Sequence, residues 1–208
     1  MENRARTNEK ISRSTERRGF PGGLSLCAVS CLVLFGAVLT RNTIQAQTAE
    51  VSQVKAAYLY NFAKFVEWPP DAFHSADDPA IICVIGDDRT SAALERAIVG
   101  KKANGRRIEA MNPRSANEFR TCNVLFIGFT DKGRILPILH SLAGSRVLTV
   151  GQADLFLSLG GMVNLLQKDG TVTLEIDPKT TDSAGLKVSS RLLVVARVVT
   201  NERAVEGP

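Results

Sequence analysis

The sequence predicts an α/β fold, namely a single layered domain with a mostly parallel sheet, flanking helices and a C-terminal antiparallel hairpin. Short apolar segments that suit buried parallel strands occur at 81–85 and 123–127. Segments with helical periodicity alternate with such strands, which is typical of α/β domains. Near the end, Lys168-Asp169-Gly170 joins two strand-like segments, 162–167 and 171–176, and Asp-Gly in that position indicates a hairpin.

The first predicted element of the domain is a helix that ends before Pro69, because proline pushes the residue before it out of the α region. Its main apolar stripe consists of residues three or four positions apart: Val51, Val54, Tyr58, Phe62 and Phe65. A second stripe contains Leu59, Phe62 and Val66. A helix that is apolar on two sides is either buried on both or docks a partner, and simple packing on the sheet is the alternative.

After the first apolar strand, the pattern predicts a helix near 91–99 and a second strand around 107–111. After the third strand, Asp131 is a suitable N-cap for a helix that reaches Leu142. Pro137 fits this helix in its first turn and otherwise kinks it.

A fourth strand is predicted at 146–150 and a short helix at 153–159. Gly160-Gly161 either lets the chain turn into the hairpin or allows a ligand or partner to approach the backbone closely. Apolar and polar residues alternate in the strand at 171–176, so we expect one of its faces to meet water. The last stretch, 189–199, suits a closing helix.

Residues 1–46 are predicted to be a signal peptide that is cleaved on export. Basic residues precede an apolar run from Leu24 to Leu39, and Ile44-Gln45-Ala46 then offers a small residue for cleavage. The apolar run is shorter than the roughly 20 residues that a membrane span needs. A retained N-terminal anchor is the alternative.

The charge of the chain argues against nucleic acid as a partner. The whole sequence has 26 basic and 21 acidic residues, but seven of the basic and three of the acidic ones belong to 1–46. The exported part therefore keeps 19 basic and 18 acidic residues, a net charge of +1. Nucleic-acid binding requires a strongly basic domain.

No motif indicates catalysis. The chain has neither the glycine pattern of dinucleotide-binding turns nor the nucleophile elbow of hydrolases. His74 and His140 lack the spacing of metal ligands. Asp87-Asp88 follows the first apolar strand, where open α/β sheets bind ligands, but we expect this pair to be a loop or helix-capping feature. We therefore predict a protein that is not an enzyme and that has no catalytic residues, no cofactor and no metal.

Five segments of the chain carry a family resemblance: Ala57–Pro69, Ile81–Gly86, Cys122–Gly128, Gly160–Leu165 and Ala184–Ala196. In this order they resemble the YfiR family of bacterial periplasmic proteins, over about residues 51–200. The resemblance implies a periplasmic protein of a Gram-negative bacterium that binds the extracytoplasmic domain of a membrane-bound diguanylate cyclase, or of another membrane signalling protein. It represses that partner and so lowers cyclic-di-GMP signalling and biofilm formation. Contact with the membrane is then only through the partner, and relatives suggest a homodimer.

The exported part keeps two cysteines, Cys83 and Cys122, on two different predicted strands. In an oxidising compartment such a pair suggests a disulfide, and two buried free thiols are the alternative. The resemblance supports the bridge, because both positions match cysteines that are common in the family. Some relatives carry a second pair near 157–164, which this chain lacks.

Candidate site residues follow from the leading function and from one alternative. Tyr60, Phe65 and Trp68 are the candidate partner contacts, since large aromatic side chains dominate binding hot spots, although the same side chains also suit a core. The alternative function is a small-molecule-binding sensor module, with the ligand in the crevice near Gly86 and Gly128. A purely structural periplasmic accessory is a third possibility.

Overall fold

The fold was determined as a computed structural model, which describes residues 48–168 and 170–199. The predicted signal peptide and Asp169 of the predicted hairpin turn lie outside the described residues. No described helix is both long enough and apolar enough to cross a membrane.

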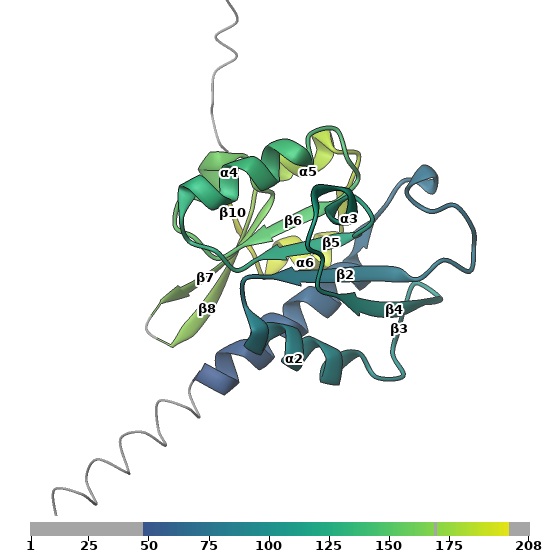
Figure 1. Cartoon of the computed structure of the whole chain (residues 1–208), viewed down its shortest axis with the longest axis horizontal. Coiled ribbons are helices and arrows are strands. Elements are labelled where there is room, and N and C mark those ends of the chain that lie inside the picture. The colour runs from purple at the N-terminus through teal and green to yellow at the C-terminus, as the bar shows by residue number, and fades with distance from the viewer. Residues whose placement is uncertain (1–47, 169, 200–208) are drawn as a thin grey trace, which may run out of the picture. The chain divides into compact units, whose positions relative to one another are not determined.

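An eight-stranded sheet forms the centre of the domain, in the order β10-β8-β7-β6-β5-β2-β4-β3 (Figure 1). Five of its neighbouring pairs are parallel, and the pairs β7–β8 and β3–β4 are antiparallel. The strands are β2 Ala80–Ile85, β3 Lys102–Ala103, β4 Arg106–Met111, β5 Val124–Ile127, β6 Leu148–Gly151, β7 Val163–Lys168, β8 Thr171–Ile176 and β10 Arg197–Val198. The predicted fold class is therefore confirmed, with its parallel centre and its antiparallel hairpin.

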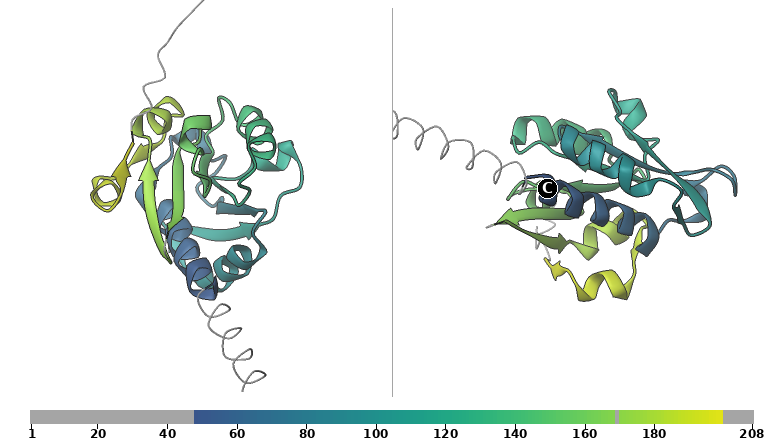
Figure 2. Two further views of the ribbon diagram at one scale, coloured as in Figure 1. Left: turned by 90° about the vertical axis from the view of Figure 1, so that its left-hand side faces the viewer. Right: turned by 90° about the horizontal axis from the view of Figure 1, so that it is seen from below.

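Helices cover both faces of this sheet, and a small second sheet pairs β1 (Val66–Glu67) with β9 (Lys187–Val188). On one face lie a helix over residues 48–65, α2 (Asp88–Ile98) and α6 (Ser190–Val194) (Figure 2). The other helical elements are α3 Ala116–Phe119, α4 Lys132–Ser141, α5 Pro178–Ser183 and the 3-10 turns η1 Pro70–Ala72 and η2 Leu157–Leu159.

The core has two parts because side chains alternate across the sheet. Val124 and Phe126 of β5 point to the face of helix 48–65, together with Ile82 and Val84 of β2. Leu125, Ile127 and Cys83 belong to the opposite face, which α4 covers through Ile135. The short apolar strands read as continuous hydrophobic runs because both faces are buried.

The first helix packs differently from the prediction. Its buried side comprises Ala56, Leu59, Phe62 and Ala63, followed by Val66 of β1. The predicted main stripe is wrong in part, since Val54 is 38% exposed, and the predicted second stripe is the buried one. The helix also ends at residue 65 rather than at Pro69, because the next two residues form β1 and the Phe65 carbonyl accepts a hydrogen bond from the Ser189 N–H.

Three predictions for the later elements also need correction. The stretch 189–199 is helical only at α6, because the chain then extends into β10 and Val199 donates its N–H to Ile176 O. Glu175 of β8 was expected to face water but is 8% exposed, since Arg197 and Asn164 contact its carboxylate. The predicted short helix at 153–159 is reduced to η2.

The cap of α4 agrees with the prediction, whereas the expected first-turn position of Pro137 does not. Asp131 accepts a hydrogen bond from the Arg134 N–H, as an N-cap residue does. Pro137 lies in the interior of the helix and not in its first turn.

The predicted disulfide between Cys83 and Cys122 is present, with the two Cα atoms 5.9 Å apart. Cys83 lies in β2, and Cys122 comes just before the neighbouring parallel strand β5. Asn123 strengthens the same junction, because its N–H donates to Ile81 O and its side chain accepts from the Ile81 N–H. The bridge therefore joins the two central strands β2 and β5 at the point where β5 begins.

We predict that reduction of this bridge destabilises the domain. The cysteines are 39 residues apart, and a loop of that length corresponds to about 4 kcal/mol of chain entropy. Dithiothreitol and the substitution Cys83→Ser should each lower the melting temperature by roughly 10 °C. The double variant Cys83→Ser/Cys122→Ser should not respond to dithiothreitol. Equal melting temperatures of the oxidised and reduced wild type would contradict the prediction.

Candidate functional site

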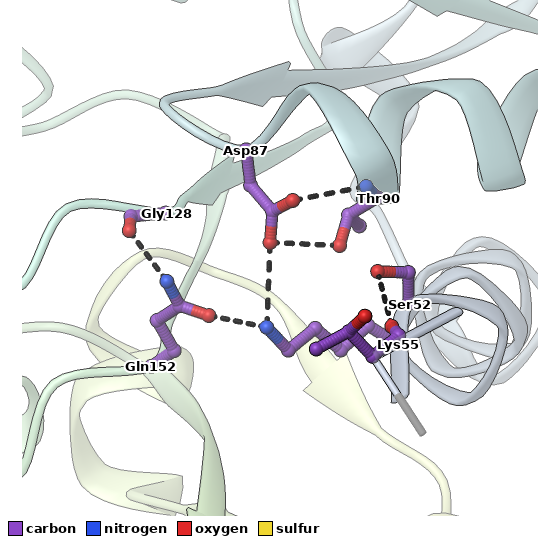
Figure 3. A network of polar contacts seen from close by, with 7 residues as sticks. Ser52, Lys55, Asp87, Thr90, Gly128 and Gln152 are labelled. Atoms are coloured by element: carbon purple, nitrogen blue, oxygen red, sulfur yellow. Dashed lines mark hydrogen bonds and ion pairs between the residues drawn. The ribbon is translucent and has the colours of Figure 1, made fainter. Parts of the chain in front are cut away.

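A network of polar side chains joins helix 48–65 to the carboxyl ends of three parallel strands (Figure 3). Lys55 of the helix lies 3.3 Å from Asp87 Oδ2 and also donates to the side chain of Gln152. Gln152 in turn donates to the carbonyl of Gly128. The side chains of Lys55 and Asp87 are only 7% and 15% exposed, so this ion pair is largely removed from water.

Asp87 also binds Thr90 in the same network. Its Oδ1 atom accepts from the Thr90 N–H at 3.0 Å, and its Oδ2 atom accepts from the Thr90 hydroxyl at 2.8 Å. Asp87 is thereby the N-cap of α2, and Asp88 lies in the first turn. Of the two expected roles, loop or helix cap, Asp87 has that of the cap.

This network fills the crevice in which open α/β sheets bind their ligands. Gly86 follows β2 and lies against the ring of Phe129, so that a Cβ atom at this glycine would be 2.2 Å from the ring. Gly128 follows β5, and a Cβ atom there would be 2.8 Å from the Cβ of Asp87. Both glycines are thus required for close packing, and their suggested role in ligand binding remains a prediction.

An open cleft lies instead at the amino end of β2, where Ala80 is part of its wall. Its volume is about 1140 Å³, and we call it the aromatic–basic cleft. The walls come from the end of helix 48–65, the turn after β1, the loop at 73–76, the β3–β4 turn and the start of α6. The aromatic and basic residues that line it are Lys64, Phe65, Trp68, Phe73, His74, Arg106 and Arg191.

Two of the three predicted partner contacts, Phe65 and Trp68, line this cleft, and Tyr60 does not. All three side chains are half-buried and pack against the core with part of their surface. Lys64 connects Tyr60 to the cleft, because its ammonium lies 5.5 Å from the Tyr60 ring centre and 5.3 Å from that of Phe65. The indole N–H of Trp68 donates to Arg146 O at 3.0 Å, which fixes the orientation of the ring.

The loop at 73–78 forms one wall of the cleft and is held by Arg106. One guanidinium nitrogen of Arg106 donates to the carbonyls of Ser75, Ala76 and Asp78 at 2.8 to 2.9 Å. The guanidinium also lies 3.9 Å from the ring centre of Phe73. Asp78 closes the loop, because its carboxylate accepts the backbone N–H groups of His74 and Ser75.

The hydrogen bond from the Ser75 N–H, supported by that from His74 and by the charge of Arg106, lowers the pKa of Asp78 below its ordinary value of 3.8. Partial burial acts in the opposite direction and is the weaker influence. The ionised form of Asp78 is therefore the one that holds the loop closed.

The opposite wall contains an exposed cation, Arg191, and a buried hydroxyl, that of Ser189. Arg191 is exposed and forms no ion pair with any residue in the described ranges. The hydroxyl oxygen of Ser189 is buried and has no hydrogen-bond partner among the described residues. Glu67 is the one carboxylate among the described residues of the lining.

Sequence reasoning found the aromatic residues but not the other walls of the cleft. Arg106 binds carbonyls about 30 positions earlier, and the wall at the start of α6 is joined to Phe65 by the hydrogen bond from the Ser189 N–H to Phe65 O. No local pattern signals either contact. Within 48–168 and 170–199, no three histidine, cysteine, aspartate or glutamate residues lie close enough to hold a metal ion.

Comparison with known proteins gives a match to a family and distant likenesses to solved structures. The family model described as YfiR/HmsC-like matches residues 52–197. A crystal structure of the ABC domain in complex with L-Trp from Streptococcus pneumonia is 13% identical, with a TM-score of 0.40. The match covers 58% of this chain and 55% of that one, so the chain spans about half of that protein, and the likeness is too distant to assign a fold or a ligand.

We predict that Lys55→Met destabilises the domain by about 3 kcal/mol, because it leaves Asp87 poorly solvated and without its cation. Lys132→Met is the matched control, since Lys132 is exposed in the first turn of α4, and it should change stability by less than about 0.5 kcal/mol. Urea unfolding of both variants measures the difference. Equal stability of the two variants would show that the network does not hold the helix in place.

A second prediction concerns acid. A carboxylate whose pKa is lowered in the folded state stabilises that state above its ordinary pKa, and the stabilisation is lost as the pH falls through the lowered value. The loop at 73–78 should therefore still be closed at pH 3.8 and should open only at a lower pH. Amide NMR signals of His74 and Ser75 report this opening, and Asp78→Asn should abolish their titration. Titration of both amides above pH 3.8 in the wild type would contradict the prediction.

Proposed function

The chain belongs to the YfiR/HmsC-like family, and from this premise we propose that it is a periplasmic repressor of a membrane-bound diguanylate cyclase. The family indicates a periplasmic regulator of diguanylate cyclase signalling, with a membrane signalling protein as its partner. The finer proposal is that this chain binds the extracytoplasmic domain of the cyclase and lowers the production of cyclic-di-GMP. The observation that carries it is the family match, which extends over residues 52–197.

The geometry supports recognition of a partner rather than catalysis. In open α/β sheets, substrates and cofactors occupy the crevice at the carboxyl ends of the strands. In this domain Lys55, Asp87 and Gln152 occupy that place and bind one another. The open surface is the aromatic–basic cleft at the other end of the strands.

Phe65 and Trp68 are the proposed anchors of the partner at this cleft. Both are half-buried, so each ring has one side fixed by the core and another side that a partner can cover. Rigid aromatic side chains lose little entropy on binding, which is one reason why they dominate hot spots. Tyr60 belongs to the same surface through its contact with Lys64.

Repression requires that the protein bind the inactive conformation of the cyclase more tightly than the active one. A difference of about 1 to 3 kcal/mol between the two affinities changes the equilibrium by five- to 150-fold. A small interface with two or three aromatic anchors supplies free energies of this size. Contacts at the cleft can therefore provide the difference in affinity that repression of the cyclase requires.

The alternative, a sensor with a small molecule near Gly86 and Gly128, requires a rearrangement. Gly128 O binds Gln152, and Lys55 lies beside it, so a ligand has to displace both side chains. We therefore favour the repressor.

We predict that Trp68→Ala weakens binding by about 30-fold, since hot-spot truncations cost roughly 2 kcal/mol. The probe is the purified extracytoplasmic domain of a membrane diguanylate cyclase from the same organism, and calorimetry gives Kd. Phe119→Ala is the matched control, because Phe119 is also half-buried but packs on the opposite face of the sheet. It should leave Kd unchanged.

In cells, deletion of the gene should raise cyclic-di-GMP, and the wild-type chain should restore the lower level where Trp68→Ala does not. Circular dichroism melting must show that both variants are folded. Absence of binding by the wild type, together with unchanged cyclic-di-GMP after deletion, would refute the proposed function.

A further inference from the structure

The charges of the aromatic–basic cleft are unusual for a domain that is nearly neutral. The exported part has a net charge of only +1, yet Lys64, Arg106 and Arg191 converge on this cleft from three different elements. Glu67 is the one carboxylate among the described residues of its lining. The positive charge is therefore a property of this site and not of the whole surface.

The three cations differ in how free they are to bind a ligand. Arg106 is used by the protein itself, because it holds three carbonyls of the loop at 73–78. Lys64 and Arg191 are exposed and form no ion pair with a described carboxylate. The rings of Tyr60 and Phe65 keep the Lys64 ammonium at the edge of the cleft through cation–π contacts.

Arg191 adds directional hydrogen-bond donors to this charge, and Ser189 lies beside it. The guanidinium of Arg191 presents several N–H donors in a planar fork, which matches the two oxygens of a carboxylate. Ser189 has a buried hydroxyl without a partner among the described residues, and buried polar atoms normally have one. Both residues line the cleft next to Phe65.

From these observations we propose that the aromatic–basic cleft binds an acidic, extended segment of the partner protein, in which a carboxylate side chain lies beside an apolar one. The carboxylate meets Arg191 and Lys64, and the apolar side chain covers Phe65 and Trp68. This inference rests on the proposed function, because it takes the occupant from the extracytoplasmic domain of the cyclase.

The size of the cleft favours a peptide segment over a small molecule. Small-molecule pockets have volumes of roughly 300 to 1,000 Å³ and enclose most of the ligand. The cleft is larger, at about 1140 Å³, and it is open to solvent. Pro69 and Pro70 give one wall a rigid apolar surface, which suits an extended chain that lies along it.

The experiment compares charge reversals at and away from the cleft. Association of the cyclase domain is measured by stopped flow at about 0.05 M and about 0.5 M salt, where the Debye length changes from roughly 14 to 4 Å. Arg191→Glu and Lys64→Glu should each reduce the association rate constant by about tenfold at low salt and flatten its salt dependence. Lys132→Glu, which reverses an exposed charge on α4, should leave both unchanged.

The outcomes separate this inference from the proposed function. If the wild type binds and the two cleft variants bind equally fast with the same salt dependence, the inference is wrong and the proposed function stands. If the wild type does not bind the cyclase domain, both are overturned. Melting curves check the fold, and Arg191→Gln should give an intermediate rate because it removes the charge without reversing it.

A binding experiment with short peptides tests the class of ligand directly. The acetylated, amidated tetrapeptide Asp-Phe-Glu-Asp should bind the wild type and lose affinity with Arg191→Glu, whereas the basic counterpart Lys-Phe-Lys-Lys should not bind. Benzoate serves as a small carboxylate with an aromatic ring. Tighter binding of benzoate than of the acidic peptide would overturn the proposal in favour of a metabolite site.

Discussion

The buried ion pair between Lys55 and Asp87 is the constraint on which the arrangement of this domain depends. It fixes the position of helix 48–65 along the sheet, because a charge that is removed from water has to stay beside its partner. It also closes the crevice at the carboxyl ends of the strands, with the help of Gln152. A helix rises about 1.5 Å per residue, so Phe65 lies roughly 15 Å further along the same helix. The ion pair at Lys55 therefore sets the position of Phe65, at the end of the helix, in the wall of the cleft.

Much of the fold was predictable because its signals are local. The apolar segments of β2 and β5, the Asp-Gly turn of the hairpin and the cap at Asp131 depend on residues that are close in sequence. The wrong predictions involve partners that are distant in sequence. The last residues have a helical pattern, but pairing with β8 draws Arg197 and Val198 into a strand. Glu175 is covered by that same strand, which no alternation within β8 could reveal.

The candidate site was predictable only in its aromatic part. Phe65 and Trp68 stand out because they precede a proline in a segment rich in aromatic residues. Lys55 carries no such signal, since a lysine on a helix normally faces water. Arg106 belongs to a basic stretch of the sequence and becomes a structural clamp only when the loop at 73–78 folds onto it. The contacts that close one end of the sheet and shape the cleft at the other thus arise only in the tertiary structure.

Both outer strands of the sheet, β3 and β10, are only two residues long. They pair with only two residues each of β4 and β8, so the outer edges of residues 108–111 and 171–174 have no strand beside them among the described residues. Pairing of a second chain with the sheet is therefore confined to these two stretches of four residues. Selectivity among neighbours then falls to the chemistry of side chains, a property that a few point substitutions can retune during evolution.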